Sequence, residues 1–138
     1  MFGDTAHRQY HYKVTSMKRD MNLIFKILEF FEARDDISII QNMKIDDYNE
    51  QVIKYHLRLM YQANLLVAEE VVSSSTKTRI IEVFPFELSW EGHEFLISLR
   101  NKNVLNKIKE RFGKSFSDVP FTILKEVALT LFRNEIGI

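Results

Sequence analysis

The side chains with the clearest chemical potential lie between residues 51 and 62, where polar residues recur at helical spacing. Arginine, lysine and glutamine can all hydrogen-bond to base edges in the DNA major groove. A solvated helix face would have a similar composition. Further along the chain, two basic residues in a polar stretch are suited to contact phosphates or the minor groove. The candidate DNA-binding residues are Gln51, Lys54, Tyr55, Arg58, Gln62, Lys77 and Arg79.

The charge around these residues weighs mildly against DNA. Asp46, Asp47 and Glu50 stand at the start of the same predicted helix, and recognition helices usually approach bases with that end. The whole chain has 19 basic and 19 acidic side chains, so its formal net charge is zero. Dedicated nucleic-acid binders are often strongly basic, although phosphate contacts require only a local patch.

A second basic cluster lies between residues 100 and 114, where Glu110 is the only acidic residue. Such a cluster could bind a nucleic-acid backbone or an acidic protein surface. The simpler interpretation is that these side chains only solvate a helix that has apolar residues on its other face. The cluster consists of Arg100, Lys102, Lys107, Lys109, Arg111 and Lys114.

Signatures of an enzyme or a metal site are missing from the sequence. The four glycines are isolated, so no phosphate-binding loop is predicted. His93-Glu94 lacks the second histidine of a zinc-protease helix, and His56 is interpreted as a hydrogen-bonded packing histidine. His7 and His11 could share a helix face but have no convincing third ligand. There is no cysteine, and we expect neither catalysis, metal binding nor a cofactor.

The elements that would position these residues follow from hydrophobic periodicity. We expect Asp47 to cap the second long helix, with Glu50 completing a capping box. Asn64 should adopt the left-handed conformation after the last turn, and Leu57 and Trp90 should lie in the core. The predicted elements are helices over 17–34, about 46–64, 90–100 and 102–112, a short strand or extended connection over 37–45, strands over 65–72 and 78–88, and a last helix capped by Ser117 or Asp118 with Pro120 in its first turn.

The order helix, short extended segment, helix, tight turn and hairpin is that of a winged helix. We therefore predict an α+β, mainly α fold: a winged helix-turn-helix with a small antiparallel β-hairpin wing and additional C-terminal helices. Residues 1–16 lack an apolar stripe and are expected to form a flexible N-terminal extension. Residues 17–138 are expected to form a single winged-helix domain with a C-terminal helical extension.

Three motifs sharpen this prediction. They are Met17-Lys18-Arg19-Asp20-Met21, the segment Ile53-Lys54-Tyr55-His56-Leu57-Arg58-Leu59-Met60-Tyr61-Gln62-Ala63-Asn64-Leu65, and Leu88-Ser89-Trp90-Glu91-Gly92-His93-Glu94-Phe95-Leu96 followed by Asn106-Lys107. Over residues 17–132 the chain resembles a family of small phage and prophage proteins known only as a domain of unknown function. The resemblance implies a winged-helix fold and no established activity. The chain departs from the family pattern at Asn64, where glycine is usual, and in the residues that precede Met17.

Taken together, these features predict a winged-helix DNA-binding protein, a transcriptional regulator of phage or mobile-element type that binds double-stranded DNA. The alternative is a non-enzymatic, protein-binding winged helix that forms a homodimer or binds a host protein. The apolar last helix could serve dimerisation or close the core. No apolar run is long enough to span a membrane, and no signal peptide is evident, so a cytoplasmic location is expected.

Overall fold

The computed structural model describes residues 18–137, apart from the side chains at 114 and 115. The extension expected over residues 1–16, with His7 and His11, lies outside the described residues. The chain is α+β and mainly helical, as predicted. Its elements are α2 (Met21–Ala33), α3 (Glu50–Gln62), β1 (Leu66–Val72), β2 (Ile80–Leu88), α4 (Trp90–Arg100), α5 (Lys102–Phe112), the 3₁₀ helix η1 (Gly113–Asp118) and α6 (Phe121–Ile136).

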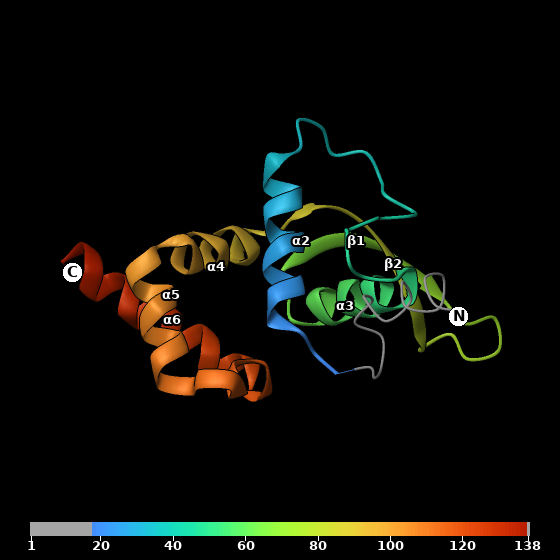
Figure 1. Ribbon diagram of the computed structural model, residues 1–138. Helices are drawn as coiled ribbons and strands as arrows, with labels where there is room; N and C mark the ends of the chain where they lie inside the picture. The colour runs from blue at the N-terminus through green and yellow to red at the C-terminus, as the bar shows by residue number, and fades with distance from the viewer. Residues whose placement is uncertain (1–17, 138) are drawn as a thin grey trace, which may run out of the picture.

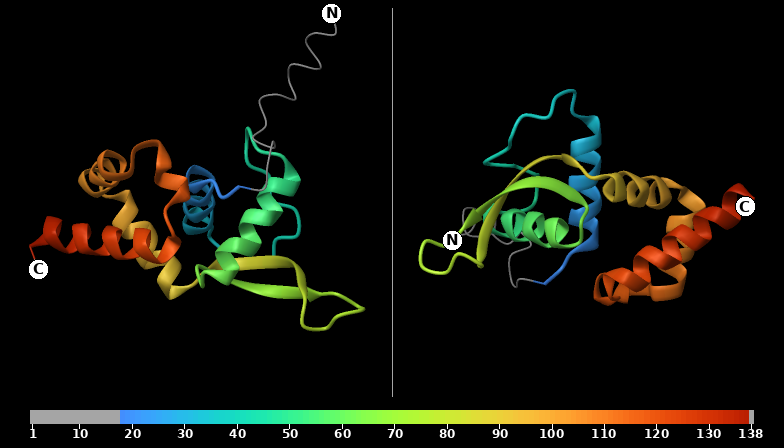
Figure 2. Two further views of the ribbon diagram at one scale, coloured as in Figure 1. Left: turned by 90° about the horizontal axis from the view of Figure 1, so that it is seen from below. Right: turned by 180° about the vertical axis from the view of Figure 1, so that it is seen from behind.

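Helix α2 lies between two groups of elements (Figure 1). On one side are α3 and the hairpin of β1 and β2, and on the other side are α4, α5 and α6. The view from behind shows the same order, and the view from below shows the hairpin extending past α3 to its tip (Figure 2). Because α2 is covered from two sides, its apolar residues must extend around more than one face. The buried residues of α2 are Met21, Leu23, Ile24, Ile27, Leu28 and Phe31.

The β-hairpin carries a bulge next to its proline. Val67 pairs with Glu87, whereas the next residue, Ala68, pairs with Pro85, so the register shifts by one residue. A proline has no N–H to donate to a ladder and is therefore tolerated at such a position. Its carbonyl accepts a hydrogen bond from the backbone N–H of Ile40 at 3.0 Å. The segment expected as a short strand or an extended connection is thus an extended connection, tied to β2 by this hydrogen bond.

The cap of α3 differs from the prediction. Asn49, not Asp47, accepts a hydrogen bond from the backbone N–H of Val52, at 2.9 Å. Asp47 has a φ of 73°, and this left-handed conformation places it in the turn before the helix rather than at the cap. The capping box with Glu50 was therefore wrong. At the other end the prediction is confirmed, because Asn64 has a φ of 64°.

The last helix also begins differently from the prediction. Pro120 occupies the position before α6 and provides no side-chain cap. The hydroxyl of Ser117 instead accepts a hydrogen bond from the backbone N–H of Met21, the first residue of α2, at 3.1 Å. Arg19 adds to this junction through hydrogen bonds to the carbonyls of Ser117, at 2.8 Å, and Val119. Arg19 and the first residue of α2 therefore fasten that helix to the segment before α6.

The start of α4 is fixed against the turn between α3 and β1. Ser89 caps the helix by accepting a hydrogen bond from Gly92 N–H at 2.9 Å, and its hydroxyl donates to the Asn64 carbonyl. A Cβ at Gly92 would stand 2.1 Å from the Leu65 carbonyl oxygen. Residues two positions apart, such as Trp90 and Gly92, differ by about 200° around the helix axis. Trp90 therefore points away from the surface that Gly92 contacts.

Trp90 is accordingly 79% exposed, and the prediction that it lies in the core was wrong. The helix cap determines this outcome, because it sets which residues of the first turn face inward. Leu57 is buried as predicted. The inward face of α4 consists of Gly92, Phe95, Leu96, Ser98 and Leu99.

The contact at Gly92 predicts an unusual sign for a helix substitution. Replacing glycine by alanine inside a helix normally stabilises a protein by up to about 1 kcal/mol. Here the added methyl group collides with backbone at Leu65, so we expect Gly92→Ala to lower the free energy of unfolding by about 1–3 kcal/mol. Denaturant unfolding measures the change. Glu94→Ala, at an exposed position of the same helix, should stay within about 0.5 kcal/mol. Equal or greater stability of Gly92→Ala would contradict the prediction.

Candidate nucleic-acid interface

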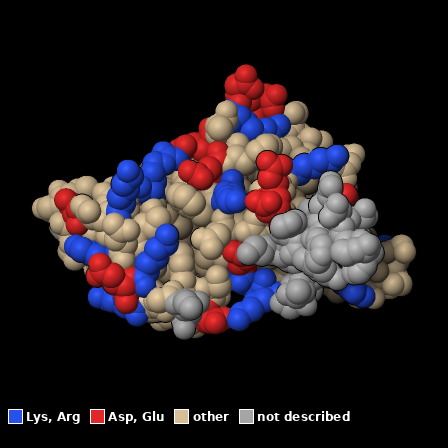
Figure 3. Space-filling model, viewed as in Figure 1, with Lys and Arg blue, Asp and Glu red and all other residues tan. Residues whose placement is uncertain are grey.

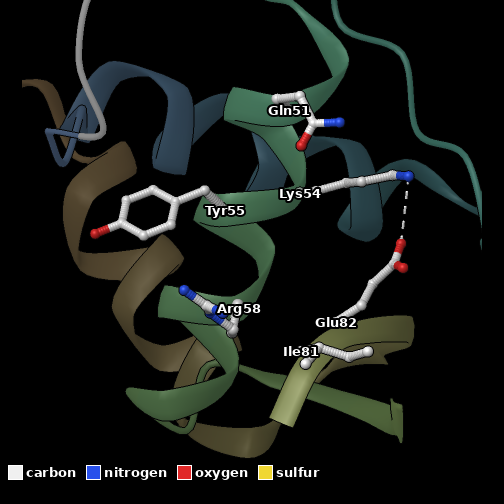
Figure 4. Close-up of a pocket in the computed structure, with 6 residues that line it drawn as sticks. All are labelled: Gln51, Lys54, Tyr55, Arg58, Ile81 and Glu82. Atoms are coloured by element: carbon white, nitrogen blue, oxygen red, sulfur yellow. Dashed lines mark ion pairs between the residues drawn. The ribbon is translucent and has the colours of Figure 1, made fainter. Parts of the chain in front are cut away.

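Four of the seven predicted DNA-binding residues line one pocket between α3 and β2. Gln51, Lys54, Tyr55 and Arg58 project from successive turns of α3, as helical spacing requires. The pocket has a volume of about 270 Å³, and Figure 4 shows its lining side chains. The residues that complete the lining are Ile81 and Glu82 of β2.

The charge of Lys54 is compensated within the protein. Its Nζ lies 3.3 Å from Oε1 of Glu50 and 3.4 Å from Oε2 of Glu82. Figure 4 shows Lys54 and Glu82 extended toward each other across the gap between helix and strand. The hydrogen bond to Glu50 and the charge of Glu82 together raise the pKa of Lys54. Lys54 therefore remains a cation, but a phosphate must compete with two carboxylates for it.

Arg58 occupies the other side of the pocket. Its guanidinium lies 5.6 Å from the centroid of the Tyr55 ring, an arrangement that favours a cation over an aromatic face. Figure 4 shows that both side chains lie on the side of α3 away from Lys54. Within the described residues Arg58 makes no ion pair, so its charge is available to an anion.

The remaining three predicted residues lie outside this pocket. Gln62 is the exposed last residue of α3. Lys77 and Arg79 are exposed at the tip of the hairpin. The tip is closed by backbone hydrogen bonds from Ser73 to Arg79, at 2.9 Å, and from Arg79 to Thr76, at 3.0 Å. The predicted set thus divides into a helix face and a wing tip.

Sequence reasoning missed Ile81 and Glu82. Both lie in the strand that was expected over 78–88, but their position opposite particular helix residues depends on the register of the hairpin. The available signal was the alternation of side chains along β2, which places every second residue on one face. Alternation alone would place the adjacent Ile81 and Glu82 on opposite faces, so it could not predict that both line the pocket. The register shifts between Val71 and Val72, whose partners are Glu82 and Ile80, and again at Pro85.

The second basic cluster is partly compensated by ion pairs. Lys107 lies 3.3 Å from Glu135, Arg100 pairs with Glu32, and the contacts of Glu135 with Asn103 and Lys107 lower the pKa of that carboxyl. Lys102, Lys109 and Arg111 are exposed, whereas the side chain of Lys114 is outside those described. Lysines and arginines alternate with acidic side chains over α4–α6 on the face seen in Figure 3. This face therefore offers no continuous basic surface.

Helix α3 is held in place on its inner side by His56, which is fully buried. The backbone N–H of Asp20 donates to Nε2 of His56 at 2.8 Å. Nε2 must therefore be unprotonated, and Nδ1 donates to the carbonyl of Val52, also at 2.8 Å. Burial lowers the pKa of His56, which is consistent with a neutral ring. The interpretation of His56 as a hydrogen-bonded packing residue agrees with this geometry.

Tyr48 reinforces the same junction. Its hydroxyl donates to Oδ2 of Asp20 at 3.2 Å. Burial, with the nearby charge of Asp20, raises the pKa of Tyr48 to about 12, so the hydroxyl keeps the proton that it donates. His56 thus ties the inner side of α3 to Asp20, and Tyr48 adds a hydrogen bond to the same residue from the turn before the helix.

Among the described residues, no three histidine, cysteine, aspartate or glutamate side chains gather closely enough to hold a metal ion. None of the helices in residues 18–137 has the length and hydropathy to cross a bilayer.

Comparison with known proteins finds relatives without an assigned activity. The model of a family described as "Hypothetical protein (DUF2513)" matches residues 18–117. The chain is also similar to an uncharacterized protein of Haemophilus influenzae, with 28% identity over 117 residues that cover 83% of this chain and 95% of the relative. No solved structure matches. The family match ends before α6.

The neutral state of His56 predicts a pH dependence of stability. Its pKa is lowered on folding, so the unfolded chain binds this proton more readily. The contribution of neutral His56 to the free energy of unfolding is fully present above the usual histidine pKa of about 6.5. It is lost as the pH falls below that value, by at most about 1.4 kcal/mol per pH unit. Denaturant unfolding between about pH 7.5 and about pH 5 measures the loss, because carboxylates titrate mainly below this range.

Two variants identify the residue responsible. His93→Gln removes an exposed imidazole and should leave the loss intact. His56→Gln should be less stable at neutral pH but should lose little further stability on acidification. A wild-type protein that is equally stable at both ends of the range would refute the assignment.

Proposed function

We propose, from the premise that the chain belongs to the DUF2513 family, that it is a winged-helix protein that binds double-stranded DNA. Its role would be that of a transcriptional regulator of phage or mobile-element type. The observation that carries this proposal is the outward face of α3. Gln51, Lys54, Tyr55 and Arg58 line an open pocket beside the hairpin, and the C-terminal helices pack elsewhere, beyond α2 (Figure 1).

In this proposal, α3 contacts the bases and the hairpin tip contacts phosphates. Arg58 and Gln51 on α3 have the donor groups that recognise purine edges in a major groove. Lys77 and Arg79 at the exposed tip are placed to contact phosphates further along the duplex. With zero net charge, general attraction to DNA is weak, so affinity has to come from these few contacts.

The test begins with a duplex selected from a random library and a scrambled duplex of the same composition. Lys54→Ala with Arg58→Ala should weaken binding of the selected duplex about tenfold or more, and the scrambled duplex less, because base contacts carry the specificity. Lys77→Ala with Arg79→Ala should weaken both duplexes alike and reduce the salt slope by about one to two. Fluorescence anisotropy titrations at several salt concentrations measure both effects.

The matched control removes two cations from another surface. Lys102→Ala with Lys109→Ala on α5 changes the net charge by the same amount and should leave the preference between the duplexes unchanged. Melting temperatures show that each variant is folded. If selection enriches no duplex, or if the α5 pair matters more than the α3 pair, the proposal fails.

A second candidate function is self-association through α4, and the exposure of Trp90 favours it. Trp90 is 79% exposed, and Ile97, two turns further along the same face, is 48% exposed. Large aromatic residues of this kind often dominate the binding energy of protein interfaces. The neighbouring Ser89 and Gly92 have evident packing roles, whereas Trp90 has none within the described part of the chain.

Trp90 is the sole tryptophan of the sequence, so its fluorescence reports directly on this candidate. If two copies associate through α4, the emission maximum should move to shorter wavelength as the protein concentration rises, because the indole leaves water. Sedimentation velocity should show the matching increase in mass. Trp90→Ala should abolish the association, and Ile123→Ala, at another exposed apolar residue, should not. A constant emission maximum with a single monomeric species excludes the candidate.

A further inference from the structure

Among the described residues, Glu82 is the one acidic side chain that lines the pocket containing the predicted base-contacting residues. It comes from β2 and faces Lys54, with 3.4 Å between Oε2 and Nζ. Its side chain is 28% exposed and that of Lys54 is 31% exposed, so both groups can reach solvent at the mouth of the pocket. A carboxylate in this place has consequences for any DNA that docks there.

The first consequence concerns phosphates. A phosphate drawn to Lys54 would approach Glu82 as well, and like charges at such a separation repel each other. Glu50, 3.3 Å from the same Nζ, adds to the competition. DNA of arbitrary sequence, which offers mainly phosphates, therefore gains little from Lys54.

The second consequence concerns bases. A carboxylate brought into a groove loses water and has to find a hydrogen-bond donor, since leaving it unpaired is costly. Among base edges in the major groove, the N4 amino group of cytosine is the donor that glutamate typically recognises. A duplex with cytosine opposite Glu82 satisfies the carboxylate and releases Lys54 to a phosphate.

We propose that Glu82 is a specificity-determining residue of the DNA interface, which opposes phosphate at Lys54 and accepts a hydrogen bond from the amino group of a cytosine. This inference rests on the proposed DNA-binding function. Glu82 would disfavour duplexes that lack the matching cytosine and favour the duplex that has it. Binding specificity commonly requires both effects.

The test compares Glu82→Gln with wild type. The glutamine has nearly the same shape but no charge, and its amide presents a donor as well as an acceptor. Glu82→Gln should bind the scrambled duplex more tightly, with a salt slope steeper by about one. A selection repeated with this variant should lose the preference for cytosine at one position, with discrimination there falling about fivefold or more.

The matched control is Glu69→Gln, which makes the same charge change at an exposed residue of β1. If Glu82→Gln and Glu69→Gln behave alike while the Lys54 and Arg58 variant still weakens binding, the inference is wrong and the proposed function stands. If the cytosine preference survives in Glu82→Gln, the base contact is refuted. If removing Lys54 and Arg58 changes duplex binding neither in the wild type nor in Glu82→Gln, both the inference and the proposed function fail.

Discussion

The hydrogen bonds that meet at Asp20 hold α3 against the rest of the molecule. Its carboxylate caps α2 through the N–H groups of Asn22 and Leu23, at 2.9 and 3.2 Å, and accepts the Tyr48 hydroxyl. Its backbone N–H donates to His56 on α3. One residue therefore fixes the start of α2 and the orientation of α3 together. On its inner side α3 makes this contact through the neutral ring of His56, whereas its charged side chains Lys54 and Arg58 line the outer pocket.

The helices were predictable because their sequences carry strong periodic signals. The expected helices over 90–100 and 102–112 coincide with α4 and α5. The details at helix ends were less predictable. Asp47 and Asn49 have equally suitable side chains for a cap, and the choice depends on a backbone angle that the sequence does not specify. Trp90 was misplaced for a related reason, since hydrophobicity alone does not tell which residue of a first turn faces inward.

In the candidate interface, too, the sequence predicts local arrangement but not which charged residues meet. The sequence predicts which α3 residues share a face, because that depends only on helical spacing. It does not predict that Glu82 faces Lys54, because that depends on how a strand is registered against a helix. Two residues of the basic cluster form ion pairs with acidic residues that are distant in sequence. Glu32, which pairs with Arg100, is 68 positions away, and Glu135, which pairs with Lys107, is 28 positions away. Counting charges along a chain is therefore a poor measure of the surface potential.

The contacts of Arg19 and Met21 have a consequence for the order in which the chain is assembled during synthesis. Their partners, Ser117 and Val119, follow them by 96 to 100 positions. While the ribosome is still making the C-terminal part of the protein, α2 can meet α3 and the hairpin but not the segment that fastens its N-terminal end. Contacts between such distant positions slow folding, because a long loop must close before they form. Helix α2 can therefore complete its contacts only after residues 117–119 have been synthesised.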